Sequence, residues 1–238
     1  MKCKQVIVMS LGIALFVLVS KSVIAAKQEV STTSEMQARE IMGTNFFGMK
    51  EASKYFGVDP TKEQVIALVK VPWSKEVLHV SKDTHVLVAV FPLSLIDIRE
   101  QSLKSTASRS LFGQSLWYEK QAFASNKGRV GWQLVRKRCV ENSTSKSWKD
   151  QQALLPKDEE TPKVQVMVYT AVGHYLSTGE NLFETVGVRC NDLDDNLGNF
   201  RTYLNFCPGH GGFWVHSWFD NEGYGRQSGV GVAAAKKQ

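Results

Sequence analysis

The sequence predicts an α+β fold in which two or more helices pack on a twisted, mostly antiparallel sheet. Two observations give the two components. Residues 164–176 carry apolar side chains at helical spacing, whereas residues 85–91 are apolar and rich in β-branched side chains, as buried strands are. A third observation is that the last sixty residues are rich in glycine and aromatic residues and follow no helical period. Short strands joined by loops are the economical interpretation of that end of the chain.

The first 26 residues are predicted to be a cleavable secretory signal peptide. Lys2 and Lys4 form a positive start, residues 6–19 are apolar, and residues 20–26 end in two alanines, after either of which signal peptidase could cut. The apolar run is about 14 residues long, short of the roughly 20 needed to cross a bilayer. An exported protein, periplasmic or secreted, is therefore favoured over one that keeps a membrane anchor.

Residues 27–238 are expected to form a single globular domain with a glycine- and aromatic-rich C-terminal segment from about residue 180. The loss of Lys2, Lys4 and Lys21 with the signal peptide lowers the formal net charge from +6 to +3. The remaining basic residues are also scattered, apart from Arg136, Lys137 and Arg138 at a predicted strand end, so nucleic acid is not an expected partner.

Helices are expected first in the N-terminal part, over residues 35–56 with a break near Gly43 or Gly48, and then from Asp59, as N-cap, to about Val69. Further along, residues 143–155 resemble a capped helix, and a longer helix capped by Thr161 should end at Gly179. The expected strands are residues 77–80, 85–91, 132–135, 186–189, 202–206, 213–217 and 230–234.

Three cysteines remain after removal of the signal peptide: Cys139, Cys190 and Cys207. In an oxidising compartment one disulfide and one leftover thiol is the simplest arrangement. We predict the pair Cys190–Cys207, because it would close a short loop in the glycine-rich end.

Candidate catalytic residues are few. Asp83 and His85 are two apart at the start of a predicted strand and would share a face, where a strand-end hydrogen bond is favoured over catalysis or metal binding. His174 flanks the apolar face of the long helix, where a single hydrogen bond is the usual role. None of the common nucleophile, phosphate-binding or dinucleotide motifs occurs. We therefore expect no catalytic residues and no cofactor, with a secreted hydrolase or metal-dependent enzyme as the alternative.

Two groups of residues have the composition of metal sites. Cys207 and His210 have a C-x-x-H spacing, but a zinc ion needs four ligands, and Cys190 and His216 complete no recognised pattern. Residues 191–196 (NDLDDN) resemble a calcium loop in composition but lack the order of an EF-hand. A solvated turn is the favoured interpretation, and no metal site is predicted.

The aromatic residues of the C-terminal segment favour a binding function. Phe213 and Trp214 are adjacent, as are Trp218 and Phe219, so in an extended strand one member of each pair points away from the core. Exposed aromatic side chains among small polar residues are typical of binding loops. The alternative is that both pairs are half buried in a small sheet.

From residue 162 onward the motifs GENLFE, VRCNDLD, GGFWVHSWFD and SGVGVAAAKK resemble those of an uncharacterised family of secreted bacterial proteins. The closing segment is similar to the variable end of retroelement-diversified proteins with a C-type-lectin-like fold. It departs from the family's W-D-D-x-R motif, which here reads WFDNE. The resemblance implies a lectin-like α+β fold with a recognition face among Tyr203, Asn205, His210, Trp214, His216, Ser217, Phe219, Asn221, Tyr224 and Arg226.

Together these observations predict an exported protein that recognises a ligand or a surface, with a protein or a glycan as its target. A structural envelope component is a further alternative. The predicted binding residues are Tyr203, Asn205, His210, Trp214, His216, Trp218, Phe219, Asn221, Tyr224 and Arg226.

Overall fold

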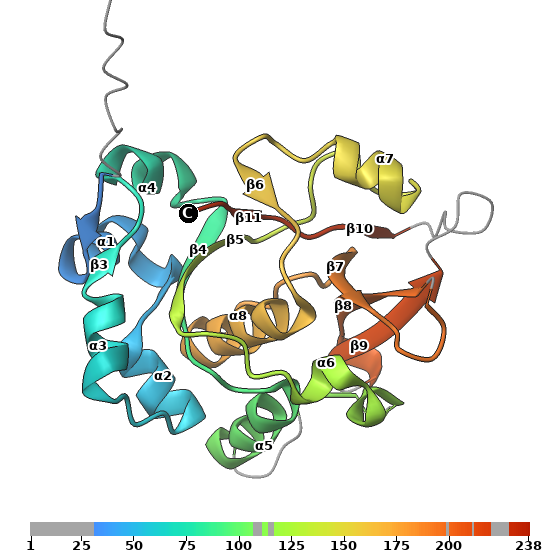
Figure 1. The fold of residues 1–238 in the computed structure, drawn as a ribbon, viewed down its shortest axis with the longest axis horizontal. Coiled ribbons are helices and arrows are strands. Elements are labelled where there is room, and N and C mark those ends of the chain that lie inside the picture. Colours follow the sequence, from blue (N-terminus) through green and yellow to red (C-terminus); the bar gives the residue numbers. More distant parts are fainter. Residues whose placement is uncertain (1–30, 107–110, 114–116, 199, 211, 220–228) are drawn as a thin grey trace, which may run out of the picture.

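The structure is a computed structural model that describes residues 31–106, 111–113, 117–198, 200–210, 212–219 and 229–238 (Figure 1). The predicted signal peptide lies outside these residues. Within the described part of the chain, no helix combines the length and the apolar character needed to span a membrane.

The α+β prediction is confirmed: the described residues form eight α-helices and three sheets that are mostly antiparallel. The helices are α1 (Glu35–Met42), α2 (Met49–Phe56), α3 (Lys62–Leu68), α4 (Lys75–Ser81), α5 (Leu95–Ser105), α6 (Ala122–Ser125), α7 (Trp148–Ala153) and α8 (Val164–Thr178). Short 3₁₀ turns are η1 (Gly43–Asn45), η2 (Trp117–Lys120) and η3 (Pro208–His210).

The largest sheet has five strands in the order β2-β4-β5-β11-β6. They are β2 (Phe46–Phe47), β4 (His85–Val90), β5 (Gly131–Arg136), β11 (Ala235–Lys236) and β6 (Glu159–Glu160). A four-stranded sheet has the order β10-β7-β8-β9, with β10 (Val230–Val232), β7 (Gly187–Leu193), β8 (Phe200–Cys207) and β9 (Gly212–Phe219). The third pairs β1 (Thr33–Ser34) with β3 (Lys70–Val71).

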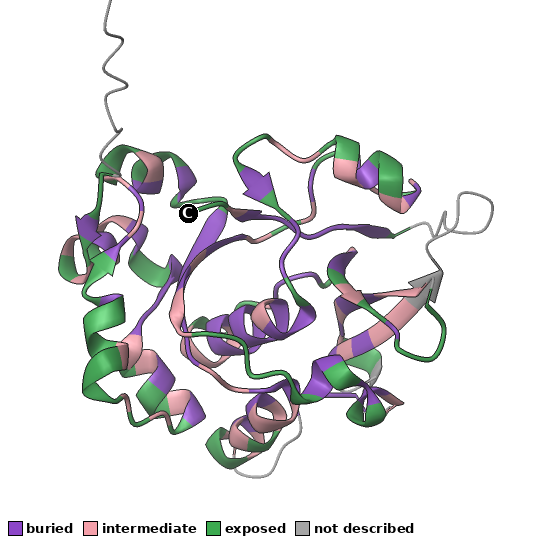
Figure 2. Cartoon of the chain, viewed as in Figure 1, coloured by how far each residue is buried: buried purple, intermediate pink, exposed green. Residues whose placement is uncertain are grey.

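Helix α8 lies at the centre of the molecule and contacts both larger sheets, through β2 and β4 on one and β7 and β8 on the other (Figure 1). Most of its residues are therefore buried around its whole circumference (Figure 2). Gly173 permits the close approach of β2, because a Cβ there would lie 2.9 Å from the Phe47 ring. Gly179 ends the helix in the left-handed conformation (φ 79°), as predicted.

The start of α8 corrects one prediction. Thr161 does not cap the helix, and its hydroxyl instead accepts a hydrogen bond from Gln152 (2.9 Å). The backbone N–H of Val164, which has no acceptor within the helix, donates to the carboxylate of Asp192 on β7 at 2.6 Å. A cap supplied by a strand is a tertiary contact, so the local sequence could not indicate it.

Other element boundaries also differ from the predictions. The predicted strand over residues 77–80 belongs to α4, because Ser74 caps that helix by accepting from the N–H of Val77. Helix α7 begins after Ser147 and not near residue 143, and α3 begins after Thr61 and not after Asp59. The break near Gly43 and Gly48 is confirmed, since α1 ends at Gly43 (φ 57°) and α2 begins after Gly48.

The C-terminal residues join the two larger sheets. Strand β10 pairs in parallel with β7, and only two residues later β11 inserts between β5 and β6. Between them, the carbonyl of Ala234 accepts from the N–H of Arg136 at 2.9 Å. The predicted single strand over residues 230–234 is thus a connection that crosses from one sheet to the other.

Candidate functional site

Four of the predicted binding residues lie on one face of the β8–β9 hairpin. The register of the two antiparallel strands places Tyr203 opposite His216 and Asn205 opposite Trp214. Because side chains alternate between the two faces of a strand, these four residues share a face. We call it the outer face, because the opposite side of the hairpin packs toward α8.

The core face of the same hairpin is apolar. Its buried apolar side chains are Leu204, Phe206, Phe213 and Val215, and the polar Thr202 is buried on the same face. The rings of Phe206 and Phe213 meet edge-on with centroids 5.0 Å apart, and Tyr175 of α8 lies 6.2 Å from each. Adjacent residues Phe213 and Trp214 therefore point to opposite sides of the sheet, as the sequence requires of an extended strand.

Three rings of the outer face form a continuous stack, which we call the aromatic stack: Tyr203, His216 and Trp214. Tyr203 and His216 are 5.3 Å apart with an interplanar angle of 21°, and His216 and Trp214 are 5.0 Å apart at 13°. The Trp214 indole also packs on Gly113, where a Cβ would lie only 2.3 Å from it. Trp214 and His216 are half-buried, and Tyr203 is 9% exposed.

The two titratable rings of the stack carry no charge at neutral pH. Burial lowers the pKa of His216, which keeps the imidazole neutral, and raises the pKa of Tyr203. The Asn205 amide donates to the Cys207 sulfur at 3.0 Å, while its Oδ1 is buried without a hydrogen-bond partner among the described residues. The nearby Arg201 is held by the Trp148 ring of α7, 4.0 Å from its guanidinium carbon.

The remaining predicted binding residues are not placed. The side chains of His210, Trp218 and Phe219, and all of Asn221, Tyr224 and Arg226, lie outside the described residues. The structure thus brings together Tyr203, Asn205, Trp214 and His216.

The predicted Cys190–Cys207 disulfide is not formed, and Cys139, Cys190 and Cys207 are all free thiols. The sheet register explains why. Arg189 pairs with Tyr203, so Cys190 lies level with Thr202, whereas Cys207 lies five residues further along β8, or about 16 Å away. A short separation in sequence across a hairpin was a poor guide to distance in space.

The histidines considered for catalysis take part in structural contacts. His85 is buried, with Nδ1 2.8 Å from the Thr84 hydroxyl and Nε2 3.5 Å from the Glu159 carboxylate. Asp83 is exposed in the turn before β4. His174 is buried and lies 2.9 Å from Glu180.

The acidic residues of the NDLDDN segment bind backbone and side-chain donors. Asp194 accepts from Gln121 and Ser217, and Asp195 accepts from the N–H of Ala122 at the start of α6. No group of three or more potential metal ligands occurs among the residues that the structure describes. These hydrogen bonds connect the segment of η2 and α6 to the four-stranded sheet.

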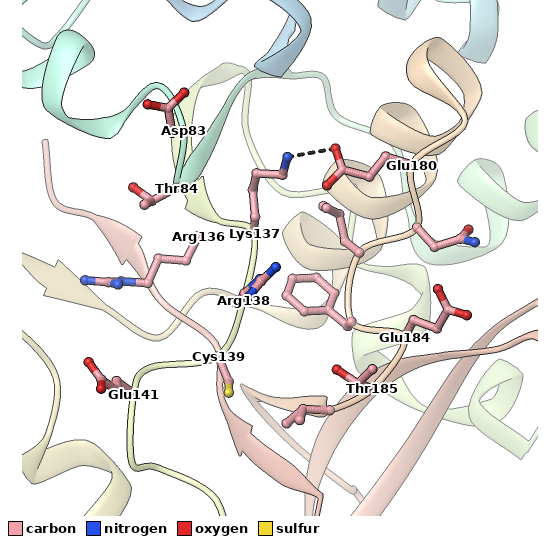
Figure 3. Close-up of a pocket in the computed structure, with 14 residues that line it drawn as sticks. Asp83, Thr84, Arg136, Lys137, Arg138, Cys139, Glu141, Glu180, Glu184 and Thr185 are labelled. Carbon is pink, nitrogen blue, oxygen red and sulfur yellow. Dashed lines mark hydrogen bonds and ion pairs between the residues drawn. The ribbon is translucent and has the colours of Figure 1, made fainter.

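A second feature, a cleft of about 830 Å³, was not predicted from the sequence (Figure 3). One wall is the segment after β5, residues 136–141, and the other is the segment after α8, residues 180–186. Asp83 and Thr84 close one end. The basic run Arg136-Lys137-Arg138 was visible in the sequence, but its partner wall lies over forty residues away.

Comparisons with known proteins give no family for this chain. No family model matches the sequence, and neither a curated protein nor a solved structure matches it. The resemblance of the C-terminal segment to diversified recognition proteins, and the C-type-lectin-like form of the α+β fold, therefore stay predictions.

Proposed function

We propose that this chain is an exported recognition protein that binds a protein target through the outer face of β8 and β9. The observation that carries the proposal is the aromatic stack of Tyr203, His216 and Trp214, in which Tyr203 is buried and the rings of His216 and Trp214 are partly exposed. Tyrosine and tryptophan provide large contact area at low entropic cost, and they are frequent among the residues that dominate protein interfaces.

The geometry of the stack favours a protein over a glycan. His216 lies between Tyr203 and Trp214, and the Trp214 ring also packs on Gly113. A sugar ring stacks on an open aromatic face, whereas this stack offers ring edges and uncharged hydrogen-bonding groups. Such a mixed apolar and polar surface suits a protein target.

The stack is also organised before any target arrives. Its residues lie on paired strands, and Phe213 and Val215, which alternate with the outer-face residues of β9, are anchored in the core. A surface that is already ordered loses less side-chain entropy on binding.

A photo-crosslinking amino acid at position 216 tests the proposal directly. The variant is expressed with its own leader, irradiated in the cell and examined for adducts, with the same substitution at exposed Ile66 on α3 as the matched control. We expect one discrete protein adduct at position 216, absent at position 66 and lost when Trp214→Ala is added. Equal labelling at both positions, or binding to a glycan array that depends on Trp214, would contradict a protein target.

Export is tested separately by the mass of the protein recovered outside the cytoplasm. We expect a mature chain that begins at residue 26 or 27. Recovery of the uncut chain in the cytoplasm would refute export without bearing on the binding face.

A further inference from the structure

The cleft between residues 136–141 and 180–186 has charged groups that the fold does not neutralise. Of its three cations, Arg136 pairs with Glu159 at 2.6 Å and Lys137 pairs with Glu180 at 2.7 Å. Arg138 is exposed in the cleft and has no ion pair or hydrogen bond with any described residue. Figure 3 shows the Lys137–Glu180 pair and the Arg138 guanidinium between the two walls.

Carboxylates without an ion-pair partner among the described residues surround this cation. Asp83, Glu141 and Glu184 all line the cleft and are exposed. Figure 3 shows them around the rim, on the turn before β4 and on both walls. The cleft therefore offers one site for a negative group and several for a positive group.

Asn181 adds an uncharged recognition group. Its Oδ1 is buried in the cleft wall and has no hydrogen-bond partner among the residues described. A buried acceptor without a donor costs free energy, and natural structures seldom keep one without a use.

The backbone near the cleft is strained as well. The described non-glycine residues with positive φ are Asn142 (58°), Ser145 (57°) and Phe183 (63°). Phe183 lies in one wall, and Asn142 directly follows the last residue of the other. For a bulky residue such as phenylalanine this conformation is an outlier, and such strain is concentrated at ligand-binding segments.

We propose that the cleft binds a short peptide. The terminal carboxylate of the peptide pairs with Arg138, and the terminal ammonium group faces the rim carboxylates. The Asn181 side chain turns to expose its Oδ1, which then accepts from a peptide N–H. A cleft of about 830 Å³ is within the range that small-ligand sites occupy. The ligand must carry both charges, because a simple anion would be repelled by Asp83, Glu141 and Glu184.

Titration of the ¹⁵N-labelled mature protein with tetra-alanine, followed by NMR, tests this site. We expect the side-chain signals of Arg138 and Asn181 to shift on addition of the peptide. Amidation of the peptide's C-terminus, or Arg138→Ala, should weaken binding about tenfold or more, because each removes a charge-assisted hydrogen bond. The matched control is Arg129→Ala, which removes an exposed arginine outside the cleft and should leave the affinity unchanged.

Asn181→Ala separates a binding role from a structural one. Removal of a buried acceptor without a partner should raise the melting temperature of the free protein while it weakens peptide binding. The proposal is overturned if tetra-alanine shifts none of the cleft signals, if acetate shifts them equally well, or if the Arg138→Ala protein binds as tightly as the wild type. None of these outcomes depends on the aromatic stack.

Discussion

The two faces of the β8–β9 hairpin are built from the same two strands and differ in almost every physical property. The core face presents Leu204, Phe206, Phe213 and Val215 to α8, and all four are buried. The outer face presents the aromatic stack and Asn205, with Trp214 and His216 half-buried. Both faces are rich in aromatic residues, so composition alone does not tell a packing face from a recognition face.

The difference lies in what each ring contacts. Phe213 meets Phe206 of the same hairpin and, from two distant segments, Tyr175 and Phe112. The contacts of His216 in the stack are with Tyr203 and Trp214 of the same hairpin. A ring that joins distant segments stabilises the fold, whereas the His216 ring, stacked within its own hairpin, should add less. Trp214 is intermediate, because it also packs on Gly113.

The largest expected effect is on the core face. Phe213→Ala should lower the free energy of unfolding by about 3–5 kcal/mol, because it leaves a cavity among three aromatic neighbours. Urea denaturation, monitored by tryptophan fluorescence, measures this loss of unfolding free energy. A loss below about 1 kcal/mol would mean that Phe213 is not part of the core, and the distinction between the faces would fail.

A second prediction concerns a charged residue, Glu159, which is buried outside the β8–β9 hairpin. Glu159 is 2% exposed and is held by Arg136, with a bidentate contact at 2.6 and 2.9 Å, and by His85. Burial alone would raise its pKa, but these partners outweigh burial and lower the pKa from 4.5 to about 2. The carboxylate therefore stabilises the fold above pH 4.5, and its contribution is lost as the pH falls toward 2.

The shift corresponds to about 3 kcal/mol at neutral pH. Glu159→Gln should remove most of that contribution and flatten the dependence of stability on pH in the acid range. Thermal unfolding at a series of pH values distinguishes the two proteins. Parallel profiles for wild type and variant would show that the carboxylate is not stabilised in the fold.

The sequence predicted those features that depend on local patterns. The apolar spacing of residues 164–176 predicted α8, and Gly179 predicted its end, because a helix and its C-cap are set within a few residues. Strands β4, β5, β8 and β9 were placed for the same reason. Helix α5 was missed, although Ser94 and Asp97 form a capping box at its start.

Features that depend on distant contacts could not be predicted. The Asp192 cap of α8, the passage of residues 230–236 between two sheets, and the cleft each join segments far apart in the chain. The disulfide prediction failed similarly, because the register of β7 and β8 and not loop length separates Cys190 from Cys207. For the outer face, the adjacent aromatic residues indicated only that one side chain of each pair turns outward, and the pairing of β9 with β8 then determined which residues are its neighbours.

The matched partner of Phe213→Ala is Trp214→Ala, at the next position on the opposite face. It should cost less than Phe213→Ala, about 1 kcal/mol, since the half-buried indole contacts His216 and Gly113 on the outer face and its removal opens no cavity in the core. The same denaturation experiment measures both variants. In the cross-linking experiment, adding Trp214→Ala should abolish the adduct at position 216. If Trp214→Ala destabilises the protein as much as Phe213→Ala, the outer face is a second core and the proposed binding site is wrong.

The smallest expected effect is the titration of His216. Burial lowers its pKa in the folded state, so the unfolded chain binds a proton more readily, and stability should fall slightly as the pH drops through about 6.5. Trp214 forms one side of the stack that buries the imidazole, so Trp214→Ala should move the pKa of His216 back toward its ordinary value. NMR titration of the imidazole signals in both proteins measures the change. An unchanged pKa would mean that the Trp214 indole does not bury His216. Trp214 would then not be part of the aromatic stack.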